Sequence, residues 1–323
     1  LGPVVNEFAF AAPGDPPVAL KRVPMCEPER ETIRAALAML RAGDVREFHA
    51  ALADWRFPTA NVVFGDAEGR IGFSLAGALP LRSPLALDAG SAAHDGSDSK
   101  HDGRAITPHG LMPHVIQPGR GARFSGNHRP VGVFYPIPLG IRTGSMGDTV
   151  RSWRLRELLE GKTSLTPKEV LAVHYDAVNP ARRTIVRMGL HLRDRLDREL
   201  SPEAERALGR LEGWYEKGAS SGLDVPGAEL ATEINTMFRF VTTELAYVYG
   251  GGDSGLSRFL KTAGRRLDES AEAEIEPMEE EFVDRVLSGA WQSAVRKYGE
   301  DPEKWNALAR RAVTERRLGY YES

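Results

Sequence analysis

The chain has 323 residues, room for about two domains of ordinary size. Its 41% hydrophobic and 27% charged residues are typical of a folded globular protein and exclude a disordered or collagen-like chain. The formal net charge of -3 argues against a nucleic-acid partner, because such proteins need a basic surface. No stretch reaches the roughly 18 apolar residues that a membrane span requires, so we expect no membrane partner either.

The cysteine count limits the possible metal chemistry. Cys26 stands alone, which excludes an internal disulfide and any CxxC site, so a metal would need oxygen or imidazole ligands. The run from His94 to Gly103 offers such ligands, but Lys100 stands where an EF-hand-like loop needs a carboxylate. We therefore predict no metal site. No glycine-rich phosphate loop supports nucleotide hydrolysis or dinucleotide redox chemistry.

The first half, residues 1–147, is rich in glycine, proline and β-branched residues. Leu1 opens an apolar strand without the basic region of a signal peptide, so we expect the chain to begin within a longer protein. Residues 83–121 are predicted to form a long polar loop. The other predicted elements are helices over 28–40 and 44–55, strands over 61–64 and 71–73 around a turn at 66–69, and a strand over 122–125.

The second half, residues 148–323, has mainly helical periodicity. A helix is predicted over 149–159, and another is predicted to start at Ser201. Thr166, followed by Pro167 and Glu169, has the pattern of a capping box. Residues 268–284 hold nine acidic and no basic side chains, which we interpret as a solvated face or a linker.

Two serine motifs are misleading in isolation. The run Gly252-Asp253-Ser254-Gly255, with Ala92-Ala93-His94 before it, is similar to the signatures of chymotrypsin-like proteases, but mainly helical sequence lies between them. We interpret the first run as a glycine-rich loop. Residues 218–222 match GxSxG, yet a helix end precedes them instead of the strand of a nucleophile elbow, which indicates a linker. A serine protease remains the third alternative.

Three stretches, read in order, carry a more specific signal. The stretches are Gly2-Pro3-Val4-Val5; residues 58–72 (PTANVVFGDAEGRIG) with 77–82 (GALPLR); and residues 110–113 leading to Asn127-His128-Arg129 and Tyr135-Pro136. Together they resemble the penicillin acylase (penicillin amidase) family of N-terminal-nucleophile hydrolases. The resemblance is specific over residues 1–162 and looser after them.

The resemblance implies an α+β protein of the αββα layered type, whose strands lie in 1–147 and whose 148–323 portion is mainly helical. It implies a hydrolase of linear amides that removes an acyl group from an amine, as in β-lactam side chains or acylated homoserine lactones, without a cofactor. By motif match, Asn127 is the oxyanion-binding amide and Arg151 the active-site arginine. Ala60 falls at a position that lines the acyl-group pocket.

The same resemblance sets expectations about the rest of the protein. The family's serine nucleophile precedes the Gly-Pro-Val-Val strand, and Leu1 is no nucleophile, so we expect this chain to be inactive alone and to need the remaining segments of its precursor. Some members of the family bind calcium through an acidic residue shortly after the Tyr-Pro pair, but residues 137–140 of this chain contain no acidic residue. Export to the periplasm or medium is expected from the family. The alternative function is a non-catalytic binding or scaffolding relative.

Overall fold

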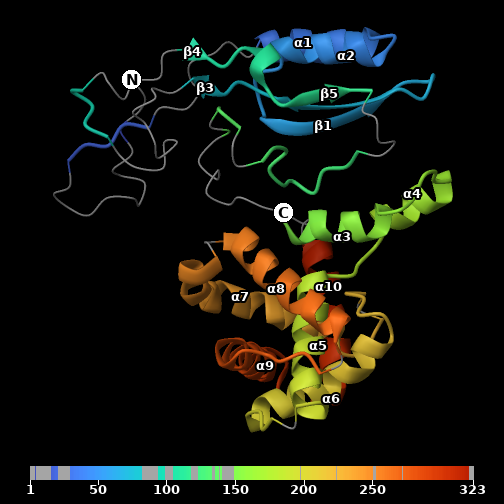
Figure 1. Cartoon of the computed structure of the whole chain (residues 1–323), viewed down its shortest axis with the longest axis vertical. Helices are drawn as coiled ribbons and strands as arrows, with labels where there is room; N and C mark the ends of the chain where they lie inside the picture. The colour runs from blue at the N-terminus through green and yellow to red at the C-terminus, as the bar shows by residue number, and fades with distance from the viewer. Residues whose placement is uncertain are drawn as a thin grey trace. The chain divides into compact units, whose positions relative to one another are not determined.

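The structure is a computed structural model in which two compact units, Leu1–Met146 and Gly147–Ser323, are each described by themselves (Figure 1). No helix among the residues that the structure describes is long and apolar enough to cross a membrane. The described residues are 4, 16–20, 30–81, 94–98, 105–117, 123–132, 135–137, 139, 149–196, 198–222, 224–249, 252–270 and 272–319.

Unit 1 places a helical layer on a small antiparallel sheet of order β1-β2-β5 (Figure 1). A second, two-stranded sheet pairs β3 with β4. The helices are α1 (Arg30–Arg41), α2 (Val45–Ala51), η3 (Leu52–Asp54) and η5 (His109–Leu111), and the strands are β1 (Ala60–Gly65), β2 (Ile71–Ala76), β3 (Pro80–Leu81), β4 (Ala105–Ile106) and β5 (His114–Ile116).

Local signals explain why the helical layer meets the sheet where it does. The Asp44 carboxylate caps α2 by accepting hydrogen bonds from the backbone N–H of Arg46 and of Glu47. Apolar side chains of α2 and η3 then pack on alternate residues of β1 and β2, forming a cluster of Val45, Leu52, Phe64 and Ala76. The two predicted helices and the predicted hairpin are therefore confirmed.

Two predictions for unit 1 are wrong. The segment 83–121 is not a loop throughout, because β5 pairs with β2 through Ser74 and His114, and β4 pairs with β3. A three-residue strand such as β5 has too few residues to show a period, so its pattern was missed. Residues 123–125 form no strand, and residue 122 lies outside the described residues.

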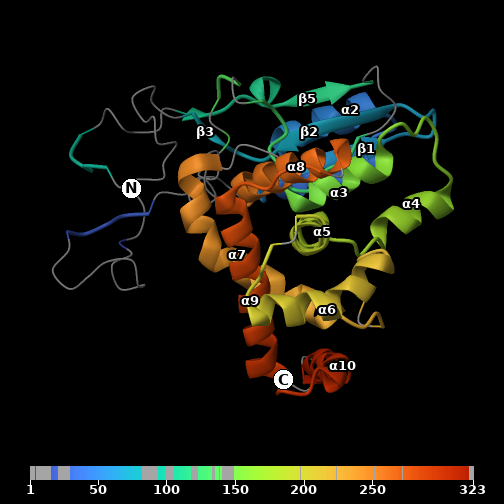
Figure 2. The same cartoon turned by 60° about the horizontal axis from the view of Figure 1, so that its bottom comes forward.

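Unit 2 is a bundle of helices around α5, which Figure 2 shows nearly end-on in its middle. Ile185, Met188 and Leu192 of α5 are fully buried. Gly189 allows close packing, since a Cβ there would lie 2.9 Å from side-chain carbons of Leu208 and of Leu287. The helices are α3 (Val150–Leu159), α4 (Pro167–His174), α5 (Pro180–Asp194), α6 (Pro202–Glu216), α7 (Ala228–Tyr249), α8 (Gly252–Glu269), α9 (Pro277–Tyr298) and α10 (Pro302–Gly319).

The predicted helix starts in unit 2 are confirmed by their caps. Thr149 caps α3, Ser201 caps α6, and the reciprocal bonds of the capping box join Thr166 to Glu169. With a sheet and helical layer in unit 1 and a bundle in unit 2, the α+β class is confirmed.

Two interpretations of unit 2 need correction. Residues 252–255 are not a glycine-rich loop but the first turn of α8. The acidic stretch 268–284 is not wholly solvated, because Glu279 is 1% exposed and pairs with Arg266. Asp284 also accepts a hydrogen bond of 2.7 Å from the backbone N–H of Ser201. Acidic residues of α9 therefore face neighbouring segments as well as solvent.

Candidate active site

Asn127, the predicted oxyanion-binding residue, stands in a tight turn between Ser125 and His128. Its φ of 60° is in the left-handed region, which costs most L-residues about 1 to 2 kcal/mol and which asparagine adopts more readily. Its backbone N–H donates to Ser125 Oγ at 3.2 Å, and the N–H of Gly126 donates to His128 Nδ1 at 3.3 Å. The Asn127 side chain is exposed and forms no hydrogen bond with a described residue, so its amide is free to meet a ligand.

A neighbouring strand holds this turn. Asn61, the second residue of β1, donates from Nδ2 to Ser125 Oγ at 3.1 Å and to the His128 carbonyl at 3.0 Å. These bonds join residues that are 64 and 67 positions apart in the sequence. The structure therefore brings the start of β1 against the Asn127 turn.

Ala60 is the first residue of β1 and lies opposite Ala76 in the ladder. It directly precedes Asn61, and because side chains alternate along a strand, the Ala60 side chain is on the face of the sheet opposite to that of Asn61. The segment that leads into Ala60 is closely packed. Trp55 Nε1 donates to the Pro58 carbonyl at 2.7 Å, and Gly77, with φ 120°, has space for no side chain because a Cβ would lie 2.6 Å from Thr59 Cα.

Arg151 lies in the first turn of α3, in unit 2, where its side chain is exposed. No hydrogen bond or ion pair joins it to another residue of the described segments. Since each unit is described by itself, the structure does not bring Arg151 together with Asn127 or Ala60. What the structure does define is the support of the helix that carries Arg151.

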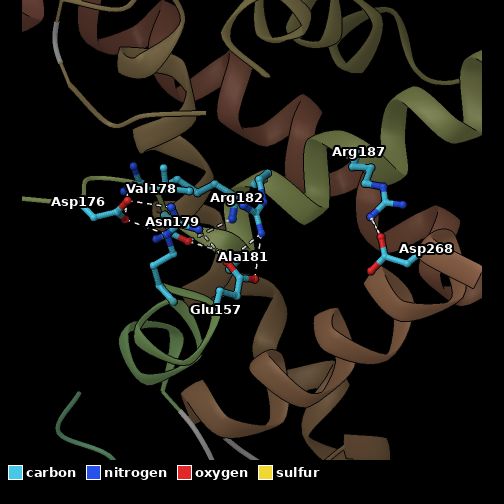
Figure 3. Close-up of polar contacts among 10 residues, drawn as sticks. Glu157, Asp176, Val178, Asn179, Ala181, Arg182, Arg187 and Asp268 are labelled. Atoms are coloured by element: carbon cyan, nitrogen blue, oxygen red, sulfur yellow. Dashed lines mark hydrogen bonds and ion pairs between the residues drawn. The ribbon is translucent and has the colours of Figure 1, made fainter. Parts of the chain in front are cut away.

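That support is a network of charges between α3 and the start of α5 (Figure 3). Arg154 forms two hydrogen bonds of 2.8 Å with Asp176 and one of 2.9 Å with Glu157. Arg183 of α5 donates to both Glu157 oxygens at 2.9 and 3.0 Å. The hydrogen bonds from Arg154 lower the pKa of the Asp176 carboxyl, which stays ionised. Asn179 caps α5 beside it.

A group of three histidines in unit 1 was not singled out from the sequence. The His49 ring lies 4.7 Å, centroid to centroid, from the rings of both His109 and His114. Burial and the two neighbouring imidazoles lower the pKa of His49 to about 4, so the ring is neutral at pH 7. Among the described residues no group of three His, Cys, Asp or Glu side chains has the arrangement of a metal site.

Asn61, Ser125 and His128 are the site residues that sequence reasoning missed. Asn61 and His128 lie inside the stretches that carry the family resemblance, which was the available signal. Their partnership could not be read from it, because hydrogen bonds across more than 60 residues depend on the folded arrangement.

The Penicillin amidase family model matches residues 1–319, nearly the whole chain. The chain belongs to the penicillin amidase family. It is 27% identical over 139 residues to penicillin acylase 2 proenzyme of Pseudomonas sp. (strain SE83), an alignment that covers 43% of this chain and 17% of that protein.

A solved structure supports the fold of this penicillin amidase family member. The thermostable penicillin G acylase from Alcaligenes faecalis matches with a TM-score of 0.56 at 16% identity, over 90% of this chain and 57% of that one. The predicted N-terminal-nucleophile hydrolase fold is thereby confirmed. The chain thus spans little more than half the length of that enzyme's chain.

Proposed function

We propose that the protein containing this chain hydrolyses a linear amide and releases an acyl group from an amine. The observation that carries the proposal is the Asn127 turn. Its backbone is left-handed at Asn127, the Asn127 side-chain amide is exposed, and Asn61 at the start of β1 bonds to the turn. Membership in the penicillin amidase family supports the reaction class. β-Lactam side chains and acylated homoserine lactones are the proposed substrates.

In the proposed reaction, a serine at the start of a processed chain attacks the amide carbon, and its own α-amine takes the hydroxyl proton. The Asn127 side-chain amide donates to the oxygen that becomes negative in the tetrahedral intermediate, together with a backbone N–H. Arg151 helps to orient the nucleophile's amine and Asn127. Ala60, a small side chain, leaves space for the acyl group.

The nucleophile is proposed to come from another segment of the precursor, so that this chain alone is inactive. The name of the Pseudomonas relative, a proenzyme, supports a processed precursor. Export to the periplasm or the medium belongs to the same proposal and rests on the family alone.

The test is to express the complete precursor, measure the masses of the mature chains and assay hydrolysis of a panel of chromogenic anilides. The panel carries aromatic, dicarboxylic and fatty acyl groups. We expect Asn127→Ala to lower kcat by roughly 10²- to 10³-fold, which is the usual effect of removing one oxyanion donor. Gln292→Ala removes an exposed side-chain amide from α9 and serves as the matched control, with activity unchanged within about twofold.

Arg151 has its own variant pair. Arg151→Lys keeps the charge but loses the planar fork of donors, so we expect kcat to fall. Arg156→Lys, also exposed and on the same helix, is its control. An unprocessed precursor that hydrolyses none of the anilides would contradict the proposal and favour the non-catalytic binding relative.

A further inference from the structure

Asn61 is placed on β1 by the register of the hairpin. It lies opposite Leu75 in the ladder, so its side chain is on the face of the sheet opposite to Phe64, whose side chain packs under the helical layer. From that face, both hydrogens of its Nδ2 amide are directed at the Asn127 turn.

The two acceptors lie on either side of Asn127. Ser125 is two residues before it and His128 one residue after it, and Ser125 Oγ also accepts from the Asn127 backbone N–H at 3.2 Å. One side-chain amide therefore fixes the backbone on both sides of a residue whose φ is 60°. Left-handed conformations of this kind persist only where the surroundings over-determine them.

The chemistry of the acceptors fixes the orientation of the amide. The carbonyl of His128 can only accept a hydrogen bond, so Nδ2 and not Oδ1 of Asn61 must face it. Oδ1 of Asn61 is buried and has no donor among the described residues. Both hydrogen bonds of this side chain therefore go to the Asn127 turn, and the sheet receives none of them.

We propose that Asn61 is a positioning residue for the oxyanion site: it holds the Asn127 turn so that the Asn127 amide meets the developing oxyanion. The inference rests on the proposed function, because it assigns Asn61 a role through Asn127. Such a donor must lie about 2.7 to 3.1 Å from the place that the oxyanion will occupy, so a small movement of the turn weakens it in the transition state.

The proposal makes a specific kinetic prediction. An interaction that acts only in the transition state changes kcat and leaves KM nearly constant. In the complete, processed enzyme, we expect Asn61→Ala to lower kcat by roughly ten- to hundredfold, since small misplacements of a catalytic group have effects of this size. Val63→Ala is the matched control, because Val63 is exposed on the same face of β1, two residues further on. Its kcat is expected to stay unchanged.

A double-variant cycle distinguishes positioning from an independent role. If Asn61 acts through Asn127, then Asn61→Ala has no further effect on kcat in an Asn127→Ala background. Losses that multiply in the double variant would overturn the proposal. So would a full kcat for Asn61→Ala beside an impaired Asn127→Ala. An unimpaired Asn127→Ala enzyme would instead overturn the proposed function, which keeps the two failures distinguishable.

The nearly isosteric variant Asn61→Asp provides a pH dependence of kcat that a simple loss of packing would not produce. In Asn61→Asp, an ionised carboxylate faces the His128 carbonyl and repels it, whereas a protonated carboxyl can donate to it. We expect the ratio of its kcat to that of the unaltered enzyme to rise as the pH falls and the carboxyl is protonated. A ratio that does not change with pH contradicts the proposal. If Asn61→Ala does not fold, Ser125→Ala takes its place in the cycle, since it removes the oxygen that accepts from both Asn61 and Asn127.

Discussion

The guanidinium of Arg154 and the carboxylate of Asp176 form a two-bond fork, with both N–O distances at 2.8 Å. Asp176 also accepts a hydrogen bond of 3.2 Å from the backbone N–H of Val178, just ahead of α5 (Figure 3). The fork therefore ties α3 to the chain that enters α5. Because Arg151 lies one turn before Arg154 on α3, the fork sets the position of the helix that presents Arg151.

Asp176→Asn is expected to lower the free energy of unfolding by about 1 to 3 kcal/mol, because it removes one of the two carboxylates that pair with the partly buried guanidinium of Arg154. Urea unfolding measures the loss. Asp301→Asn, which removes an exposed carboxylate paired with Lys304, is the control and should leave the unfolding midpoint unchanged. Equal effects of the two substitutions would show that the fork does not support α3.

Acid should weaken the same fork. The hydrogen bonds from Arg154 lower the pKa of Asp176 in the folded protein, so the unfolded chain binds the proton more readily. The stabilisation is therefore complete above the ordinary aspartate pKa of about 3.9 and is lost as the pH falls through the lower folded value. Chemical shifts of the Asp176 carboxyl carbon over pH 6 to 2 would measure that pKa, and a midpoint at or above the ordinary value would contradict the expectation.

His49 should make the stability of unit 1 depend on pH in a higher range. Its folded pKa of about 4 is below the ordinary value of 6.5, so the unfolded chain takes up a proton first. The stabilisation is complete above about pH 6.5 and declines as the pH falls toward 4. Hydrogen exchange of β2 amides between pH 7 and 4.5, corrected for intrinsic rates, would measure the decline.

Removing the imidazole tests the origin of this dependence. In His49→Gln the decline should become shallower, whereas His174→Gln, at an exposed position on α4, should leave it unaltered. Part of the dependence is expected to remain in His49→Gln, because burial also lowers the pKa of His109. If the stability of His49→Gln declined with falling pH as steeply as that of the unaltered protein, the decline could not be assigned to His49.

Gly77→Ala is expected to destabilise the chain by about 1 to 3 kcal/mol, because φ is 120° there and the new Cβ would lie 2.6 Å from Thr59 Cα. The chain must move near Ala60, so activity should fall as well. Gly96→Ala, where a Cβ meets nothing within 4 Å, is the control, with a change within about 0.5 kcal/mol. Thermal unfolding of the two variants, side by side, measures the difference.

Ala60→Phe should change which acyl groups the enzyme accepts. A large side chain at the first residue of β1 fills the space that the proposal gives to the acyl group, so kcat/KM should fall more for bulky acyl groups than for acetyl. Val63→Phe places the same ring at an exposed position of the same strand and controls for general effects. Equal losses of kcat/KM for all acyl groups would show that Ala60 does not line the acyl-group pocket.

Local chemistry made much of the secondary structure predictable from the sequence. The cap residues Thr149, Thr166 and Ser201 act on backbone groups within three positions, so their helix starts were correct. The Asp66–Gly69 turn is equally local, because Asp66 accepts from the backbone N–H of Arg70 at 2.9 Å. Residues 252–255 show the limit of this reasoning: glycine-rich composition indicates a loop, yet this segment is the start of α8, because local propensity is only a weak guide to the folded state.

The sequence by itself determined the family, the helical character of the second half, and the positions of Asn127, Arg151 and Ala60 as site predictions. Only the tertiary structure decided that β5 completes the sheet, that Glu279 is buried against Arg266, and that Asn61 holds the Asn127 turn. The physical reason is separation along the chain. Caps and turns join groups a few residues apart, whereas Asn61 meets its acceptors across 64 and 67 residues, a pairing that no local pattern records.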